Sequence, residues 1–320
     1  MKKLTLSICI FLSALGASAQ GRKSFSDFTL LRQFYNPALT GYGGSSLKML
    51  YRDQWTGFEN APRTLFASAE MGSKELSSWA KGEEVGVETT RNSWGLFAMH
   101  DEFGPFADSR VGINYGSRAR LSEGITLRVG GAATYSLQRL RSQTLILDNP
   151  NDPEMTGYLG QDGRSSRFDL ALGIALTGED FYLGYGVRDA TGGYEASGDG
   201  FLEDANVARH SVQAGVRRGF SESIGVVLNG VYHYDRNDKG LAEGQAKLVF
   251  RDMVWLGAGY RQSLAYSFTG GLQLSRFRVG YSYEKATEDA QYMSRPSNEF
   301  SLSYSLFNKS AESTRKLTVW

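Results

Sequence analysis

The sequence predicts an all-β protein, a transmembrane antiparallel β-barrel of about fourteen strands. Three observations lead to this prediction. Large hydrophobic residues alternate with small or polar ones, with a period of two, in run after run along the chain. The links between these runs are alternately short and long, as they are in barrels of the outer membrane. The first residues of the chain have the features of an export signal.

The clearest alternation runs from Phe168 to Arg188. Every second residue from 168 to 176 is a large hydrophobe, and small or polar residues stand between them. After a polar turn at 177–180 the alternation starts again and continues to the end of the segment. A period of two indicates an extended strand, and two such runs joined by a tight turn indicate an antiparallel hairpin.

The hydrophobic face of this hairpin contacts either a protein core or lipid, because soluble β-sandwiches and barrels in lipid both show the alternation. In a barrel the face contacts hydrocarbon, where a charge near the midplane costs about 2–4 kcal/mol. Arginine at Leu172 or Leu183 should then impair assembly. Serine at Gly173, on the opposite face, should be better tolerated.

Residues 1–19 are predicted to be a signal peptide. Two lysines after the first methionine supply its positive start, residues 4–15 are its short apolar core, and the small residues at 17–19 suit a cleavage site. The apolar run is too short to span a bilayer as a helix. The one cysteine of the sequence, Cys9, lies within this segment, so we expect a mature chain without disulfides or cysteine catalysis.

The composition suits a chain of many strands. The 320 residues have a formal net charge of +1, which gives no indication of nucleic-acid binding. Glycine (38), tyrosine (17) and phenylalanine (18) are plentiful, whereas there are 6 prolines. The mean hydropathy is mildly negative, which a transmembrane barrel allows because each strand has one apolar face and the lumen is polar.

Strand-like runs follow one another through most of the chain. Residues 20–44 have no clear period and are predicted to be a periplasmic leader segment, residues 45–307 the outer-membrane barrel, and residues 308–320 a C-terminal tail. The predicted strands lie near residues 45–53, 63–71, 93–101, 109–120, 125–138, 167–177, 181–189, 209–219, 224–235, 244–250, 253–261, 265–274, 277–283 and 298–307. An even number of strands is typical of single-chain bacterial barrels.

The lengths of the links distinguish a barrel from a sandwich. From the fourth strand onward every second link is short, at 121–124, 177–180, 221–223, 251–252 and 275–276. The intervening links are mostly longer, at 139–166, 190–208, 236–243 and 284–297. Outer-membrane barrels have short periplasmic turns and long extracellular loops, whereas a sandwich has no reason for this parity. Gly72–Asn92 and Gln262–Leu264 are exceptions, the first being long among the short links and the second short among the long ones.

The less hydrophobic face of the strands carries charged residues. They are Arg118, Arg128, Arg188, Arg217, Arg278 and Asp169. Because charge on the lipid face is costly, these side chains should point into the lumen. They form either a basic lining that attracts anions, or a set of structural ion pairs and hydrogen bonds that fills a narrow interior.

Signatures of catalysis and of metal binding are weak. His100, His210 and His233 have neither HExxH nor clustered spacing, and no nucleophile-elbow motif occurs. The glycine pairs of the chain lack the strand-to-helix context of a phosphate-binding loop. The acidic stretch 148–154 fits a solvated surface loop better than a calcium site. We therefore expect no enzymatic activity, no metal and no cofactor.

A set of motifs near the start of the chain is not explained by barrel patterning. It comprises Asn36-Pro37-Ala38-Leu39-Thr40-Gly41, then Tyr51-Arg52-Asp53-Gln54-Trp55-Thr56-Gly57-Phe58, then Ala61-Pro62-Arg63-Thr64. In this spacing the set resembles the N-terminal signature of the PorP/SprF family, which are outer-membrane proteins of the type IX secretion system. Later stretches resemble the same family, at 101–106, 180–184, 255–261, 279–283 and 298–304. The sequence departs from the family pattern at Asn60, where glycine is common, and in the polar tail after the last strand.

The resemblance implies a non-enzymatic outer-membrane barrel that works with the type IX secretion apparatus. Its partners would be components of that apparatus, the lipid of the outer membrane, and a large secreted surface protein, often an adhesin of gliding motility, which the barrel helps to export or to hold at the cell surface. The residues implied to contact a partner are Asn36, Pro37, Arg52, Gln54, Trp55 and Phe58. The same segment also has an architectural explanation, because Asn-Pro suits a turn and Arg52 could pair inside the barrel mouth.

Two other functions stay open on the sequence alone. One is a passive porin or a transporter of small solutes, apolar compounds among them, which a wide and water-filled lumen would favour. The other is a barrel enzyme that acts on lipid, which loss of a hydrolase activity on changing one of the three histidines would identify. The predicted location is the outer membrane in each case.

Overall fold

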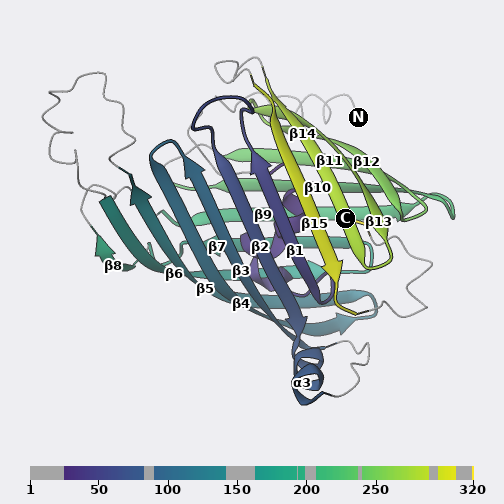
Figure 1. Cartoon of the computed structure of the whole chain (residues 1–320). Coiled ribbons are helices and arrows are strands. Elements are labelled where there is room, and N and C mark those ends of the chain that lie inside the picture. The colour runs from purple at the N-terminus through teal and green to yellow at the C-terminus, as the bar shows by residue number, and fades with distance from the viewer. Residues whose placement is uncertain are drawn as a thin grey trace, which may run out of the picture.

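The computed structural model describes residues 25–82, 90–141, 163–192, 194–198, 207–236, 240–287, 295–307 and 319–320. Within these ranges the chain forms one antiparallel sheet that closes on itself as a barrel (Figure 1). Of the fifteen strands in these ranges, fourteen make the wall, because β8 (Tyr194–Gly198) is a side strand that pairs with β6 (Gly163–Thr177) next to the end of β7 (Phe181–Arg188). The predicted fold is therefore confirmed.

The wall strands follow the order of the sequence around the barrel. The strands are β1 Ser46–Asp53, β2 Arg63–Gly72, β3 Asn92–Phe103, β4 Phe106–Ser122, β5 Ile125–Leu140, β6 Gly163–Thr177, β7 Phe181–Arg188, β8 Tyr194–Gly198, β9 Arg209–Gly219, β10 Ile224–Tyr234, β11 Leu241–Phe250, β12 Val254–Arg261, β13 Ala265–Leu274, β14 Phe277–Ala286 and β15 Ser297–Ser305. The helices are η1 Phe28–Leu31, α2 Arg32–Tyr35 and η2 Pro37–Leu39 before the barrel, and α3 Ser73–Lys81 between β2 and β3. Each predicted strand overlaps one wall strand.

The first and last strands close the barrel. β1 pairs with β15 from Ser46 opposite Ser305 to Asp53 opposite Asn298, and it pairs with β2 on its other side. A closed ladder suits a membrane, because lipid offers no hydrogen-bond partner to the backbone groups of an open sheet edge. No helix in the described ranges has the length and apolarity needed to cross a bilayer.

The two faces of the wall show the predicted division of side chains. In β6 the large hydrophobes point outward, with Leu172 62% exposed, while Asp169 and Ala175 are buried on the inner side. β7 continues the pattern, with Leu183 outward and Tyr182 inward. An outer face made of large aliphatic and aromatic side chains is the surface that hydrocarbon favours.

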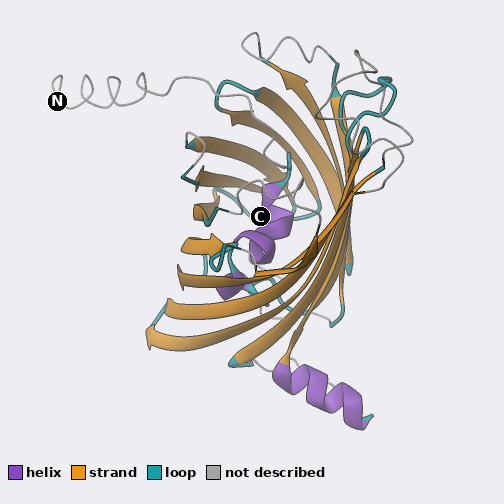
Figure 2. Ribbon diagram, turned by 90° about the vertical axis from the view of Figure 1, so that its left-hand side faces the viewer, coloured by secondary structure: helices purple, strands orange, loops and turns teal. Residues whose placement is uncertain are grey.

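Two links hold elements that the sequence did not predict. β8 lies within the predicted long link at 190–208, and α3 lies in the long link between β2 and β3. The α3 helix starts after Gly72, whose backbone N–H donates to Glu75 Oε2 at 3.1 Å, and stops at Gly82, which has a φ of 70°. Glycine adopts this left-handed conformation without strain, so it is a common helix stop. The helix projects from the end of the barrel where β2 ends (Figures 1 and 2).

The segment that precedes β1 lies inside the lumen (Figure 2). Residues 25–40 are buried with the exception of the half-buried Leu30, and their short helices lie inside the wall. Residues 25–40 of the predicted leader segment, 20–44, therefore lie inside the barrel and not in the periplasm. The physical reason is the apolar content of this part, which is removed from water when it packs on the inner wall.

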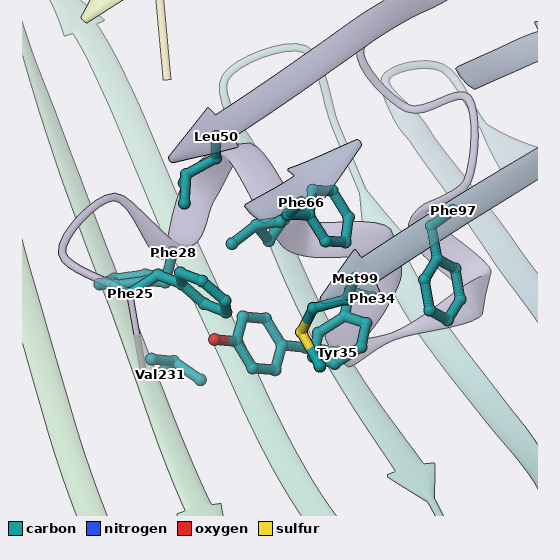
Figure 3. Close-up of a cluster of buried hydrophobic side chains, with 10 residues drawn as sticks. Phe25, Phe28, Phe34, Tyr35, Leu50, Phe66, Phe97, Met99 and Val231 are labelled. Atoms are coloured by element: carbon teal, nitrogen blue, oxygen red, sulfur yellow. The ribbon is translucent and has the colours of Figure 1, made fainter. Parts of the chain in front are cut away.

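The hydrophobic core lies where this segment meets the inner wall (Figure 3). The buried side chains that form it are Phe25, Phe28, Leu31, Phe34 and Tyr35 from the segment, and Leu50, Phe66, Phe97, Met99 and Val231 from the wall. The Phe34 ring meets those of Phe66 and Phe97 edge to face, with centroids 6.0 and 5.3 Å apart. The large apolar residues of this part of the inner wall are thus partners of the segment and do not line a pore.

Candidate functional site, the plugged lumen and the adjoining rim

Residues 25–44, here called the luminal plug, are shaped by a capped turn. The Asn36 side-chain oxygen accepts a hydrogen bond from the backbone N–H of Ala38 at 3.0 Å, which caps η2, and Pro37 occupies the first position of that helix. Asparagine and proline are preferred at these two positions. The Asn36 amide also donates to the carbonyl of Ile174 in β6 at 3.2 Å, so the same residue ties the plug to the wall.

Inner-wall glycines let the plug approach the wall closely. A Cβ at Gly130 would overlap the Pro37 carbonyl group, and a Cβ at Gly173 would overlap Asn36 Oδ1. Glycine is the residue that permits such a close approach of a second segment. Serine at Gly173 should therefore carry a cost of its own, because this face of β6 contacts the plug and is not open lumen, and the expectation that it is better tolerated than arginine at Leu172 stays a prediction.

A buried ion-pair cluster joins the start of the plug to the wall. Arg52 is 1% exposed, and its guanidinium lies 2.7 Å from Glu284 and 3.2 Å from Glu299. The two oxygens of Glu299 also accept the backbone N–H groups of Ser26 and Asp27, each at 2.9 Å. Arg52 and Glu299 face each other where β1 pairs with β15. The cluster therefore ties the plug to the wall at the place where the first and last strands of the barrel meet.

The cluster continues along the inner wall to β11 and β12. Arg261 pairs with Glu284 at 3.1 Å and with Glu243 at 3.0 Å. His233 lies 3.9 Å from Glu243, and its ring centroid is 4.9 Å from that of Tyr35. Charges buried this deeply are tolerated when each has an opposite partner. This pairing favours the structural interpretation of the luminal charges over a lining that attracts anions.

A second ionic contact holds the plug to β11. Lys247 is 2% exposed, and its ammonium lies 3.1 Å from Asp27 Oδ1. Burial acts to raise the pKa of Asp27, but the Lys247 charge and the hydrogen bond from Thr29 outweigh it and hold this pKa below its ordinary value of 3.8. Asp27 is consequently an anion at neutral pH and pairs with Lys247.

The arginines of the inner face point inward, as predicted, and four of them lie over aromatic rings. The contacts are Arg188 with Phe34, Arg217 with Trp320, Arg128 with Tyr42 and Arg278 with Trp255, at guanidinium-to-centroid distances of 4.4, 4.5, 5.2 and 5.8 Å. A guanidinium over a ring face is attractive, more so away from water. Three of these four rings belong to the plug or to the end of the sequence, so the arginines serve to hold these segments.

The second half of the signature forms the turn between β1 and β2, residues 54–62, here called the rim turn. Trp55 packs edge-on against Phe103, with ring centroids 5.7 Å apart. Phe58 is 47% exposed, and the Arg295 guanidinium lies 4.5 Å from its ring centroid. Because β2 runs from the rim turn to α3, the rim turn and α3 lie at opposite ends of the barrel.

The structure divides the six residues implied to contact a partner into two groups. Asn36, Pro37 and Arg52 are buried and hold the plug and the wall together, so the folded barrel does not present their side chains to a partner. Gln54, Trp55 and Phe58 lie in the rim turn. A role in partner contact stays a prediction for this second group.

The residues considered for chemistry do not come together within the described ranges. His100 Nδ1 lies 2.8 Å from the Ser109 hydroxyl, and His210 Nδ1 lies 2.7 Å from the Tyr185 hydroxyl, which are ordinary cross-strand contacts. The acidic stretch 148–154 lies outside the described residues.

Sequence reasoning missed the wall residues that form the buried ionic contacts around the plug. They are Glu243, Lys247, Arg261, Glu284 and Glu299. A local signal was present, because each stands in a strand whose alternate residues are hydrophobic, and a charge on the other face must then lie inside and needs a partner. The partners were not predictable, since Ser26 and Glu299, for example, are 273 positions apart.

One of the similar solved structures supports the fold, and two others are less similar. A structure described as the CymD monoaromatic hydrocarbon channel has a TM-score of 0.52 and 12% identity, over 91% of this chain and 95% of that one. The Pseudomonas putida toluene transporter TodX has a TM-score of 0.45 and 11% identity, over 92% and 96%. The Acinetobacter baumannii outer membrane protein Omp33 has a TM-score of 0.44 and 9% identity, over 82% and 96%. At such identities the likeness to CymD shows the fold alone.

Comparison with family models supplies the family. No curated protein matches the chain significantly. The model of the type IX secretion system membrane protein PorP/SprF, however, matches residues 17–304, which include the plug, the rim turn and all but the end of the wall. A closed barrel with a hydrophobic outer face agrees with this match and with an outer-membrane location. The chain therefore belongs to the PorP/SprF family of type IX secretion system membrane proteins.

Proposed function

We propose that this barrel is an outer-membrane partner of the type IX secretion system that helps to export a large, adhesin-like secreted protein or to hold it at the cell surface. The observation that carries the proposal is the family match over residues 17–304. The barrel acts by protein–protein recognition, without catalysis and without a cofactor. Its partners are components of the secretion apparatus and the secreted protein.

The plug supports recognition over conduction. Residues 25–40 occupy the lumen and are fixed to the wall by ion pairs, hydrogen bonds and aromatic contacts. A passive porin or a transporter of small solutes requires an open path, so a segment fixed in the lumen counts against that alternative.

The rim turn is the proposed recognition surface. Its backbone is closed by a hydrogen bond from the Gln54 N–H to the Pro62 carbonyl at 2.9 Å, and Trp55 is fixed against Phe103. Phe58 stands exposed on this fixed turn. An aromatic side chain that loses little freedom on binding is a typical anchor of a protein interface. By the parity of the links, the rim turn faces the outside of the cell.

The test compares two exposed phenylalanines at opposite ends of the barrel. Phe58→Ala, alone and with Gln54→Ala, is introduced into the full chain in cells, and Phe220→Ala, in the turn after β9 and 70% exposed, is the matched control. All variants should assemble as heat-modifiable barrels. The rim variants should lose co-purification with secretion components and with the secreted protein, and the control should keep it.

Two outcomes would contradict the proposal at different levels. Normal co-purification and normal surface display in the rim variants would show that the rim turn is not the recognition surface. Normal display of all type IX secreted proteins in cells that lack this barrel altogether would refute the proposed function itself.

A further inference from the structure

A second segment enters the lumen from the other end of the sequence. Val319 and Trp320 are 0% and 6% exposed. They share a hydrophobic cluster with Ala38 and Leu39 of the luminal plug and with residues of the inner wall. Figure 2 marks this end of the chain inside the barrel, beside the helices of the plug. The two residues are therefore part of the packed interior.

The Trp320 ring is enclosed by groups from the plug and from the wall. On the wall, the Arg217 guanidinium lies 4.5 Å from a ring centroid, and the Tyr182 ring meets it edge to face at 5.1 Å. On the plug, the Arg32 guanidinium lies 5.4 Å away and the Tyr42 ring 5.8 Å away. Tryptophan is the aromatic residue that binds cations best. Two guanidinium groups and two rings around one indole form a site built for this side chain.

The main chain of the pair is bonded as well. The Trp320 main-chain oxygen accepts from Lys247 Nζ at 2.7 Å and from Thr29 Oγ1 at 3.2 Å. The N–H of Val319 donates to Asp252 Oδ1 at 3.1 Å. Lys247 also pairs with the plug, as described above, so one buried ammonium joins the wall, the plug and the end of the sequence.

We propose that Arg32, Tyr42, Tyr182, Arg217 and Lys247 form a binding site for a short peptide that carries tryptophan, and that Val319–Trp320 is the ligand that occupies it. This pair, here called the latch, locks the luminal plug against the wall. Since the indole contacts the plug on one side and the wall on the other, the plug cannot leave the lumen while the latch is seated. Release of the latch therefore precedes release of the plug.

The first test measures the site itself. The full chain without residues 319–320 is folded in detergent and titrated with a peptide of residues 315–320 that has a fluorescent label at its first residue. Saturable binding is expected, and the peptide with Trp320→Ala should bind about tenfold more weakly, because an enclosed aromatic anchor dominates such contacts. The complete chain should bind the peptide about tenfold more weakly than the shortened one, since its own latch competes at high effective concentration. Equal binding of the two peptides by the shortened chain, or no binding, would overturn the proposal.

The second test follows the plug in the complete chain and does not depend on the shortened one. In a Cys9→Ser background, Ala38→Cys places a thiol on the buried face of the plug beside the latch, and its rate of reaction with a water-soluble maleimide is measured. Trp320→Ala should raise this rate about tenfold, because a local opening becomes easier when the contacts that oppose it are lost. Arg217→Gln, which removes one guanidinium from the Trp320 ring and keeps the indole itself, should raise the rate by a smaller factor.

The control for this test is a thiol at Ser267, a buried position on β13 away from the latch. Ser267→Cys should react slowly in every variant if the wall stays closed. If Trp320→Ala leaves the reaction rate of the thiol at Ala38→Cys unchanged, the proposal of a latch is overturned. Neither test uses a secretion partner, so both outcomes are independent of the proposed function.

Discussion

Replacing Arg52 by methionine should destabilise the barrel, because it leaves two buried carboxylates without the cation that they share. Arg52 is 1% exposed and lies 2.7 Å from Glu284 and 3.2 Å from Glu299. Methionine keeps the length and the apolar packing of the side chain but removes its charge. Removing one partner of a buried pair costs about 3–5 kcal/mol in the free energy of unfolding.

The expected loss of stability within this range depends on the contacts that the two carboxylates retain. Glu284 retains Arg261 at 3.1 Å, and Glu299 retains the backbone N–H groups of Ser26 and Asp27. The loss should therefore be near the lower limit, about 3 kcal/mol. Adding Glu299→Gln removes an uncompensated charge but replaces one acceptor oxygen by a donor. The double variant should consequently recover part of the loss, not all of it.

The assay is urea unfolding of the barrel in lipid vesicles, followed by the loss of heat-modifiable mobility. Arg63→Met is the matched control, because Arg63 stands on the same hairpin with a side chain that is 64% exposed, 3.5 Å from Asp53. An exposed pair of this kind contributes about 0–1 kcal/mol. If Arg52→Met loses no more stability than Arg63→Met, the reasoning from the buried cluster is refuted.

Three further predictions test the plug, the lipid face and the charge of Asp27. Gly173→Ser should lower the free energy of unfolding by about 1–3 kcal/mol, because its side chain overlaps Asn36. Gly131→Ala is the control and should have little effect in the same urea titration, since a Cβ there would lie 3.7 Å from its nearest neighbour. Leu172→Arg should reduce the yield of assembled barrel in outer membranes, at a cost of about 2–4 kcal/mol near the midplane, and Leu172→Met should not; equal yields would mean that this face does not contact lipid. Since the pKa of Asp27 in the folded barrel lies below 3.8, its pairing with Lys247 is complete above that pH and is lost as the pH falls through the lowered pKa. Loss of this pair should loosen the plug, so conductance in planar bilayers should rise once the pH falls below that lowered pKa, and Asp27→Asn should raise it already at pH 5. An unchanged conductance in this variant would exclude Asp27 as the group responsible.

The wall was predictable from the sequence because lipid and lumen impose a local rule on every strand. Between 168 and 176 of β6, each outward residue is hydrophobic and each inward one is small or polar, so this alternation identifies the strand without knowledge of its neighbours. The α3 helix was missed within a link, although Leu76 and Trp79 are three positions apart and Gly82 follows as a stop. A helix of nine residues offers too few turns for its period to stand out.

The plug could not be predicted in the same way, because its shape depends on the wall. Phe28, Leu31 and Phe34 recur every three residues, which is a helical spacing that could have argued against an unstructured leader. Their partners, however, lie on strands distant in the sequence, and no local pattern identifies them. The signature motifs led to the correct family, yet the burial of Asn36 and Arg52 shows that a motif can mark an internal support as well as a surface for partners.

The Arg52–Glu299 pair sets an order of events for biogenesis. Its two residues are 247 positions apart and meet where the first wall strand joins the last. Such a contact forms only after the whole barrel sequence is present, and closing so long a loop delays it. Because Glu299 also accepts the N–H groups of Ser26 and Asp27, closure of the wall and seating of the plug are completed together. A nascent barrel whose ends have not met would hold its plug by fewer contacts and expose luminal aromatic side chains, which makes this intermediate the one most in need of assembly factors.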